Sequence, residues 1–168
     1  GFGDAYGIAR TTEFTLSVKQ STPSRDEMIN MTEQVRHPAR LVAAPSDYLE
    51  AKVFGGVWSL PDRSTPARKQ IEDRLAWQVQ YYAGQVDQRH WYGFWNYGDI
   101  MHTYDVDRHV WRYDIGGYAW DNSELSPDLW LWYSFLRSGD PTSFHLAERM
   151  TRHNRDVDIY HAGRFKGL

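Results

Sequence analysis

The stretch SPDLWLWYSFLRSGDPTSFHLAERMTRHNRD, residues 126–156, gives the clearest indication of the fold of this chain. Its first half predicts a helix over 124–137, because large apolar residues recur at helical spacing: Leu129, Trp132, Tyr133 and Leu136. Gly139 is typical of a helix end, and Asp140 followed by Pro141 is typical of the start of the next helix. That second helix is predicted over 140–156, with an inward face of Phe144, Ala147 and Met150 or Thr151. The two helices form a hairpin with a very short turn.

Another helix is predicted over 66–83, with Thr65 as its cap and Gly84 at its end. Its apolar stripe consists of Ile71, Leu75, Val79 and Tyr82. Residues 90–122 read as a long irregular loop rich in glycine, aspartate and aromatic rings, with an extended piece over 110–115. Helices joined by long, ring-rich loops favour an α/α toroid, and this chain would hold part of one.

The first third of the chain differs in composition. Residues 7–20 alternate apolar and polar side chains, which predicts a strand. A turn at 21–27 leads into a short helix that runs to about residue 36. Residues 37–62 carry several prolines and two adjacent glycines, so we interpret them as an irregular linker. The change in composition here marks a domain boundary.

Composition narrows the possible functions. A net charge of -3, with 24% charged residues and no polybasic tract, argues against a nucleic-acid or membrane partner. The absence of cysteine excludes disulfides, thiolate metal sites and cysteine nucleophiles. Eight Trp and 11 Tyr in 168 residues is a rich aromatic content. Because a pyranose presents an apolar C–H face to a ring, this content fits either a carbohydrate cleft or a core built from rings.

Three blocks carry a family resemblance: WYGFWNYGDIMHTYD (91–105), WRYDIGGYAWDNSE (111–124) and LRSGDPTSFHLAERMTRHNRDVDIYH (136–161). Together they resemble the exo-rhamnogalacturonan lyase and YetA-like family. GIARTTEFTLSV (7–18) is similar to a strand late in the central β-sandwich of that family.

The resemblance implies an N-terminal barrel, a central β-sandwich and a C-terminal α/α toroid. Residues 1–37 would then be the C-terminal piece of the sandwich with its linker, and 38–168 the N-terminal part of the toroid. The expected fold is mainly α with a small β portion. The chain opens without an initiator Met, and we expect a fragment whose partner is the remainder of a parent chain.

The activity that the resemblance implies is removal of units from rhamnogalacturonan I by β-elimination. A uronate lyase needs a base for the C5 proton, a group that neutralises the carboxylate and an acid for the leaving oxygen. We predict His102 and Tyr104 as base and acid, and Arg112 as the partner of the carboxylate. Asp99 is grouped with them as a catalytic candidate.

Two other classes of function stay open. A glycoside hydrolase would use two carboxyl groups, and Asp99, Asp121 and Glu124 lie in or beside the ring-rich loops. Asp121 and Glu124 suit a helix start equally well, since acids there stabilise the helix dipole. A non-catalytic carbohydrate-binding relative is the third class.

The predicted substrate contacts lie in the same loops and near the end of the chain. They are Trp91, Trp95, Tyr97, Tyr118, Trp120, Asp121, Asn122, Glu124 and His161. A second group of rings lies on the helices among apolar neighbours, so we interpret it as core: Trp77, Trp130, Trp132 and Tyr133.

No resident metal or cofactor is predicted. The alternative is a divalent cation such as calcium that bridges an acidic sugar. RHNRDVDIYH (152–161) offers four candidate ligands, His153, Asp156, Asp158 and His161, although its arginines fit a solvated face with ion pairs. The expected ligand is an acidic plant cell-wall oligosaccharide or polysaccharide. The location is left open, with an extracellular or periplasmic setting favoured over a cytoplasmic one.

Overall fold

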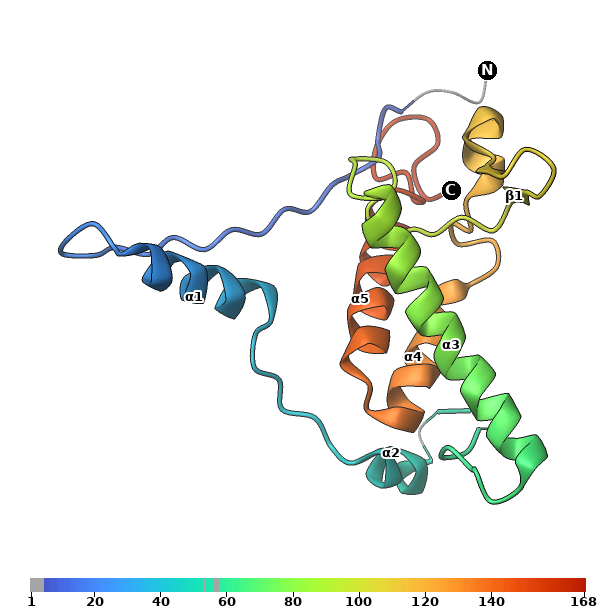
Figure 1. Cartoon of the computed structure of the whole chain (residues 1–168). Coiled ribbons are helices and arrows are strands. Elements are labelled where there is room, and N and C mark those ends of the chain that lie inside the picture. Colours follow the sequence, from blue (N-terminus) through green and yellow to red (C-terminus); the bar gives the residue numbers. More distant parts are fainter. Residues whose placement is uncertain (1–4, 53, 56–57) are drawn as a thin grey trace. The chain divides into compact units, whose positions relative to one another are not determined.

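The computed structural model describes residues 5–52, 54–55 and 58–168 (Figure 1). The chain divides into two compact units. One is Thr11–Ala43, and the other joins the residues up to Arg10 with Ala44–Leu168. The described residues are mainly helical, with a two-stranded sheet as the β portion. The prediction of a mainly α chain is therefore confirmed.

The unit Thr11–Ala43 contains one helix, α1 (Arg25–Arg36), where the sequence predicts it. A capping box starts the helix: the Glu27 N–H donates to the Ser24 hydroxyl, and the Ser24 N–H donates to the Glu27 carboxylate at 2.7 Å. None of its residues is buried.

The predicted strand over 7–20 is wrong, because residues 8–19 have no regular structure. Its apolar side chains are almost fully exposed, at 88% for Phe14, 84% for Leu16 and 90% for Val18. A strand is stabilised by hydrogen bonds to a neighbouring strand, and among the described residues no strand or bridge pairs with this segment. Alternation of apolar residues is therefore not sufficient for a strand here.

The predicted hairpin forms the centre of the second unit, as α4 (Pro127–Ser138) and α5 (Pro141–Asp156) packed along each other (Figure 1). Gly139 adopts a left-handed φ of 71°, and its N–H donates to the Phe135 carbonyl at 2.7 Å. The Asp140 carboxylate caps α5 by accepting the Ser143 N–H at 2.8 Å. The buried face of α4 differs from the predicted stripe: it holds Leu131, Phe135 and Leu136, while Leu129 is exposed.

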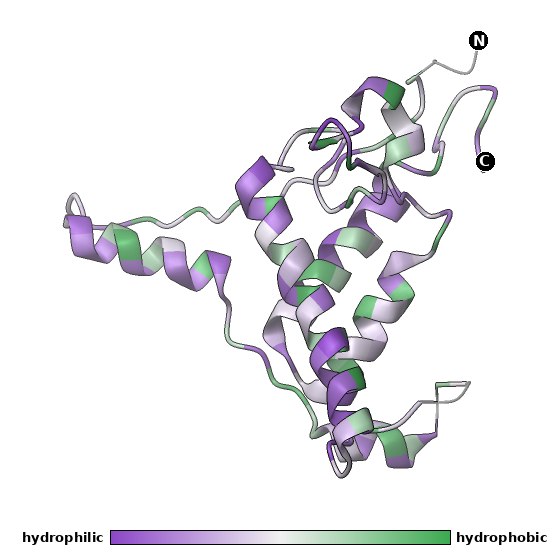
Figure 2. Cartoon of the chain, turned by 45° about the vertical axis from the view of Figure 1, so that its right-hand side comes forward, coloured by the Kyte–Doolittle hydropathy of each residue, from purple (hydrophilic) through white to green (hydrophobic). Residues whose placement is uncertain are grey.

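Helix α3 (Pro66–Arg89) packs against α5 and is longer than predicted. Thr65 caps it, but Gly84 does not end it, and the chain leaves the helix at His90 with a φ of 54°. Its buried residues are Glu72, Val79 and Val86, seven positions apart, so only a narrow stripe faces the core. Figure 2 shows hydrophobic positions interspersed with hydrophilic ones along the helices.

The interpretation of residues 37–62 as an irregular linker misses a short helix, α2 (Pro45–Ala51). It packs against α4, where Tyr48 and Phe135 lie with ring centroids 6.3 Å apart. The Asp47 carboxylate accepts the Ala44 N–H at 3.1 Å and closes its first turn.

The ring-rich loop folds into an antiparallel hairpin. Strand β1 (Tyr104–Asp105) pairs with β2 (Val110–Trp111), and a bridge between Met101 and Trp120 extends the pairing inward. The expected extended piece over 110–115 is confirmed only for β2, because the 3-10 segment η1 (Tyr113–Ala119) follows. The core lies between this hairpin and the helices. It contains Val79, Val86, Trp91, Ile100, Met101, Trp111, Ala119, Leu131, Leu146, Ala147 and Met150.

Candidate functional site

His102 and Tyr104 lie on the first arm of the ring-rich hairpin, two residues apart. The His102 N–H donates to the Ala119 carbonyl at 3.0 Å, and Tyr104 is paired with Trp111. Alternate residues of an extended segment share a face, so the two side chains are on the same face of the hairpin. Both reach solvent. The ring of Tyr104 meets Trp111 edge to face, with the ring centroids 5.2 Å apart.

Arg112 lies in a cluster of opposite charges on the second arm. Its Nε donates to Asp114 at 2.8 Å, a second bond of 3.2 Å joins the same carboxylate, and Asp105 is 4.0 Å away. Arg108 binds both carboxylates as well, and its Nε lies 2.7 Å from Asp105. A uronate approaching Arg112 would therefore compete with Asp114.

Asp99 is buried, with 1% of its surface exposed, so its carboxylate is not accessible to a substrate. Its Oδ1 accepts the N–H of Ile100 at 2.8 Å and that of Asn122 at 3.1 Å, so one carboxylate joins the two ends of the hairpin. Its Oδ2 lies 3.4 Å from Nε2 of His153 on α5, and Asp158 lies 3.3 Å from the same nitrogen.

Asp99, His153 and Asp158 are close enough for the charge of each to affect the pKa of the others. Burial raises the pKa of Asp99 to about 7, although His153 and the two N–H donors act in the opposite direction. Burial disfavours the charged form of His153, but Asp158, Asp99 and the Tyr97 backbone outweigh it and raise the pKa of the imidazole. The arrangement suits a buried anchor that titrates near neutral pH.

Asp121 is the second buried acid of the hairpin. Its N–H donates to the Ile100 carbonyl at 2.8 Å, and its Oδ1 has no hydrogen-bond partner among the described residues. Burial raises the pKa of Asp121, with the charge of His102 acting in the opposite direction. Asn122 donates its side-chain amide to the Gly117 carbonyl at 3.1 Å, and Glu124 is exposed.

Trp91 belongs to the core and not to an open surface. It is 1% exposed, its indole N–H donates to the Tyr113 hydroxyl at 2.8 Å, and Trp111 and Trp120 meet its ring edge to face. An indole enclosed in this way cannot stack on a sugar. Trp120 is half-buried against it.

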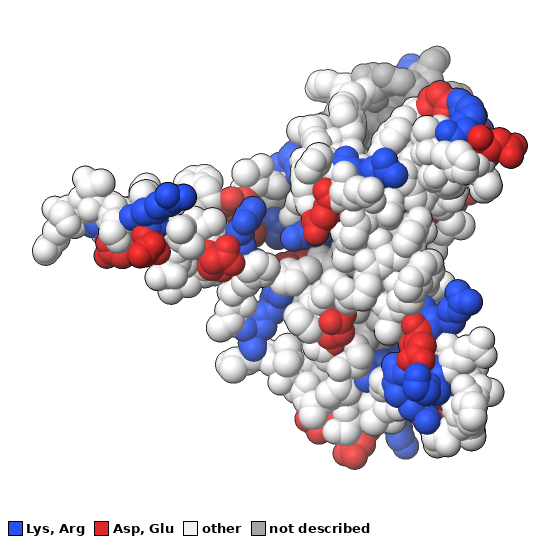
Figure 3. Space-filling view, in the orientation of Figure 1, with Lys and Arg blue, Asp and Glu red and all other residues white. Residues whose placement is uncertain are grey.

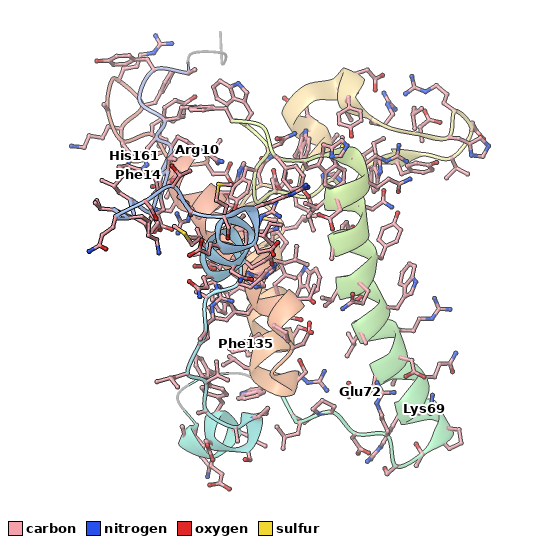
Figure 4. The ribbon with its side chains drawn as sticks, turned by 60° about the vertical axis from the view of Figure 1, so that its left-hand side comes forward. Arg10, Phe14, Lys69, Glu72, Phe135 and His161 are labelled. Carbon is pink, nitrogen blue, oxygen red and sulfur yellow. The ribbon has the colours of Figure 1, made fainter. Side chains whose placement is uncertain are left out.

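The other predicted contacts are scattered. Trp95 and Tyr118 are 56% and 88% exposed, and Tyr97 lies under the guanidinium of Arg10 at 4.6 Å. His161 is engaged with the Arg155 carbonyl at 2.8 Å. Arg10 and His161 are labelled in Figure 4. The cavity beside Trp91 and Tyr97 measures about 10 Å³, too small for a sugar ring.

A sugar-sized pocket lies elsewhere, between α3, α4 and residues 58–59, with a volume of about 420 Å³. Its rings are Trp58, Trp130 and Tyr133, and Gln78 and Arg137 add polar groups. The sequence interpretation assigns Trp130 and Tyr133 to the core; both are half-buried, and Trp130 packs against the core cluster. The sequence could not reveal this pocket, because Trp58 and Tyr133 are far apart along the chain and come together only in the folded structure.

Of the four residues considered as metal ligands, the structure brings His153 and Asp158 together. The described residues hold no group of three or more His, Asp or Glu side chains able to bind a metal ion. Within the same residues, none of the helices is long and apolar enough to cross a bilayer. On the face drawn in Figure 3, acidic and basic side chains lie beside each other in mixed groups.

Comparison with known proteins places this chain. Residues 38–168 match the family described as "PcRGLX-like protein C-terminal alpha/alpha toroid domain". The chain is also 48% identical over 166 residues to "Uncharacterized protein YetA" of Bacillus subtilis strain 168. The match covers 98% of this chain and 19% of the relative, so the chain spans about a fifth of that protein's length. The resemblance drawn from the sequence is confirmed, and the chain belongs to the PcRGLX-like family through its C-terminal α/α toroid domain.

Proposed function

We propose that this chain is part of a carbohydrate-active enzyme that cleaves rhamnogalacturonan-type pectin by β-elimination. The observation that carries the proposal is the family match over residues 38–168, because this is the family for which the sequence resemblance implies that reaction. The chain spans only 19% of its relative, so the activity is proposed for a longer protein that contains it.

The geometry of the ring-rich hairpin supports a role for His102 and Tyr104 as base and acid. Elimination transfers the C5 proton of the uronate to a base while another group protonates the leaving oxygen. Two groups of this kind must flank one sugar and remain accessible to it. His102 and Tyr104 lie two residues apart on one arm of the hairpin and both reach solvent, which supports this assignment.

Arg112 is proposed to neutralise the uronate carboxylate as negative charge builds on it. In the unliganded arrangement its guanidinium is held by Asp114 through two hydrogen bonds. A uronate would replace Asp114 or share the guanidinium with it, because Arg112 is only partly exposed. The planar fork of arginine suits either arrangement.

Hydrolysis through paired carboxyl groups is less well supported. Such a mechanism places two carboxyl groups on either side of an accessible glycosidic bond. Asp99 is 1% exposed and Asp121 is 6% exposed, so neither carboxylate can touch a substrate without a rearrangement of the hairpin. Asp99 is better explained as a positioning residue that holds the hairpin together through Ile100 and Asn122.

The test uses the full-length protein that contains this chain, incubated with rhamnogalacturonan I oligosaccharides while ultraviolet absorbance is followed. β-Elimination creates an unsaturated product that absorbs, and hydrolysis creates reducing ends without that absorbance. Tyr104→Phe keeps the ring contact with Trp111 but removes the hydroxyl, and His102→Gln removes the titratable group. Loss of general acid or base catalysis is expected to lower the rate by about 10²-fold or more.

His109→Asn is the matched control, because His109 is an exposed histidine of the same hairpin and its φ of 54° is tolerated by asparagine. This control is expected to keep the wild-type rate. New reducing ends without absorbance would replace the lyase proposal with hydrolysis. Neither signal, with the protein folded, would leave carbohydrate binding without catalysis.

A further inference from the structure

The pocket between α3 and α4 is lined by rings, one of which belongs to Trp58. Trp58 and Tyr133 lie with centroids 6.2 Å apart at 50°, and Trp130 contributes a third ring from α4. Its volume of about 420 Å³ falls within the range of small-ligand sites. Rings set at an angle leave apolar faces that a flat C–H surface can cover.

Two hydrogen bonds join described residues near Trp58 to α4. The Tyr133 hydroxyl donates to the Gly55 carbonyl at 2.9 Å, and Nε of Arg137 donates to the Ser59 carbonyl at 2.5 Å. Trp58 lies between these two attachment points. Gly55 and Ser59 are therefore each bonded to a side chain of α4.

The electrostatics of the pocket favour a neutral ligand. Arg137 is bound to Glu72 of α3 at 2.6 Å (Figure 4 labels Glu72), and both side chains are largely buried. Burial opposes the charge on Glu72, but Arg137 and the Asp62 N–H outweigh it and lower the pKa of that carboxyl. The pair is therefore ionised and self-neutralised, so Arg137 has little charge to offer a uronate.

Gln78 is a polar residue that lines the pocket. The Gln78 amide makes no hydrogen bond within the part of the chain that the structure describes, and it offers both a donor and an acceptor. Hydroxyl groups of a sugar can use both functions, whereas a purely apolar ligand would use neither.

We propose that this pocket is a binding subsite for a neutral pyranose unit of a carbohydrate chain. The apolar C–H face of the sugar lies on Trp58 or Trp130, and a hydroxyl pair meets the Gln78 amide. This inference rests on the proposed carbohydrate function and deepens it, since the charged sugar would be recognised at Arg112 and the neutral sugar here.

The experiment measures binding, not turnover, with the full-length protein that contains this chain. Methyl rhamnoside and methyl galactoside serve as neutral probes and galacturonate as the acidic probe, followed by saturation-transfer NMR and tryptophan fluorescence. A neutral glycoside is expected to bind roughly tenfold more tightly than galacturonate at this pocket. Gln78→Ala and Trp58→Ala are each expected to weaken that binding by about fivefold or more.

Trp77→Ala is the control, because Trp77 is a half-exposed indole on the same helix as Gln78 but outside the pocket. It should leave the affinity unchanged. Gln78 is exposed, so Gln78→Ala keeps the fold even if Trp58→Ala does not. Equal or tighter binding of galacturonate that is lost in Gln78→Ala and Trp58→Ala, or neutral binding that survives Gln78→Ala, would overturn the proposal. So would a complete lack of binding, which is the result expected if another part of the longer protein fills the pocket.

The two proposals fail separately. Neutral-sugar binding at the pocket without any unsaturated product would remove the lyase activity and keep this subsite. An unsaturated product with no effect of either pocket variant on neutral-sugar binding would do the reverse.

Discussion

Replacing Asp99 with asparagine should remove most of the pH dependence of stability near neutral pH. The buried carboxyl has a pKa of about 7, against about 4 in an unfolded chain, so the native state keeps its proton over a range where the unfolded state has lost it. The stabilisation that Asp99 contributes is then complete below about pH 4 and declines as pH rises towards 7. For an isolated group this difference corresponds to about 4 kcal/mol.

His153 adds to the same trend. A histidine whose pKa is raised on folding also binds its proton more tightly in the native state, so its contribution is lost as pH rises from about 6.5 through the higher native value. Asp158 is the other ionisable group that faces it. Wild-type protein should therefore lose stability steadily between pH 5 and pH 8, by about 2 to 3 kcal/mol from Asp99 alone.

The asparagine variant preserves the local geometry. Its Oδ1 can accept the N–H groups of Ile100 and Asn122, and its amide can donate to Nε2 of a neutral His153. Urea unfolding at several pH values measures the effect. Relative to the wild type, Asp99→Asn should therefore gain about 2 kcal/mol or more of stability between pH 5 and pH 8.

Asp107→Asn supplies the control, since Asp107 is an exposed aspartate of the same hairpin. It should leave the pH profile of the wild type unchanged. Parallel profiles for wild type and Asp99→Asn would refute the reasoning, because they would mean that Asp99 does not titrate differently in the two states.

Three further substitutions test the packing. Arg137→Met strands the buried carboxylate of Glu72 and should lower the urea unfolding free energy by about 3 kcal/mol or more, and a loss below about 1 kcal/mol would contradict a buried pair. Tyr113→Phe removes the acceptor of the enclosed Trp91 indole, with an expected cost of about 1 to 3 kcal/mol in the same assay. Gly98→Ala forces a Cβ against a backbone carbonyl of α5 at a φ of 95°, so its melting temperature should fall by several degrees, and an unchanged value would count against this contact.

The features that the sequence predicted correctly depend on near neighbours along the chain. Thr65, Gly139 and Asp140 mark helix ends because their caps bond residues within a few positions. Gly84 failed as a stop because glycine costs a helix only about 1 kcal/mol, which the packing of α3 on α5 outweighs.

Features that failed depend on partners far along the chain. The strand over 7–20 has the right alternation but lacks a pairing segment among the described residues. The rings show the same limit: Trp91 is enclosed by Trp111 and Tyr113, whereas Trp77 on α3 is half exposed. Residue type and local spacing do not distinguish these two indoles, because burial depends on what the rest of the fold places against each one.

The ring-rich hairpin links the buried cluster to the proposed chemistry. Asp99 Oδ1 accepts hydrogen bonds from Ile100 at one end of the hairpin and from Asn122 at the other, and His102 lies three residues beyond Asp99 on the first arm. His102 is held in the same hairpin, because its backbone N–H donates to the Ala119 carbonyl. A change in the charge of Asp99 near neutral pH would therefore affect the position of His102 through the backbone hydrogen bonds of the hairpin, without any contact between Asp99 and a substrate. The sequence placed both residues in one catalytic group, and the structure separates them into an accessible side chain and the buried acid that holds its strand.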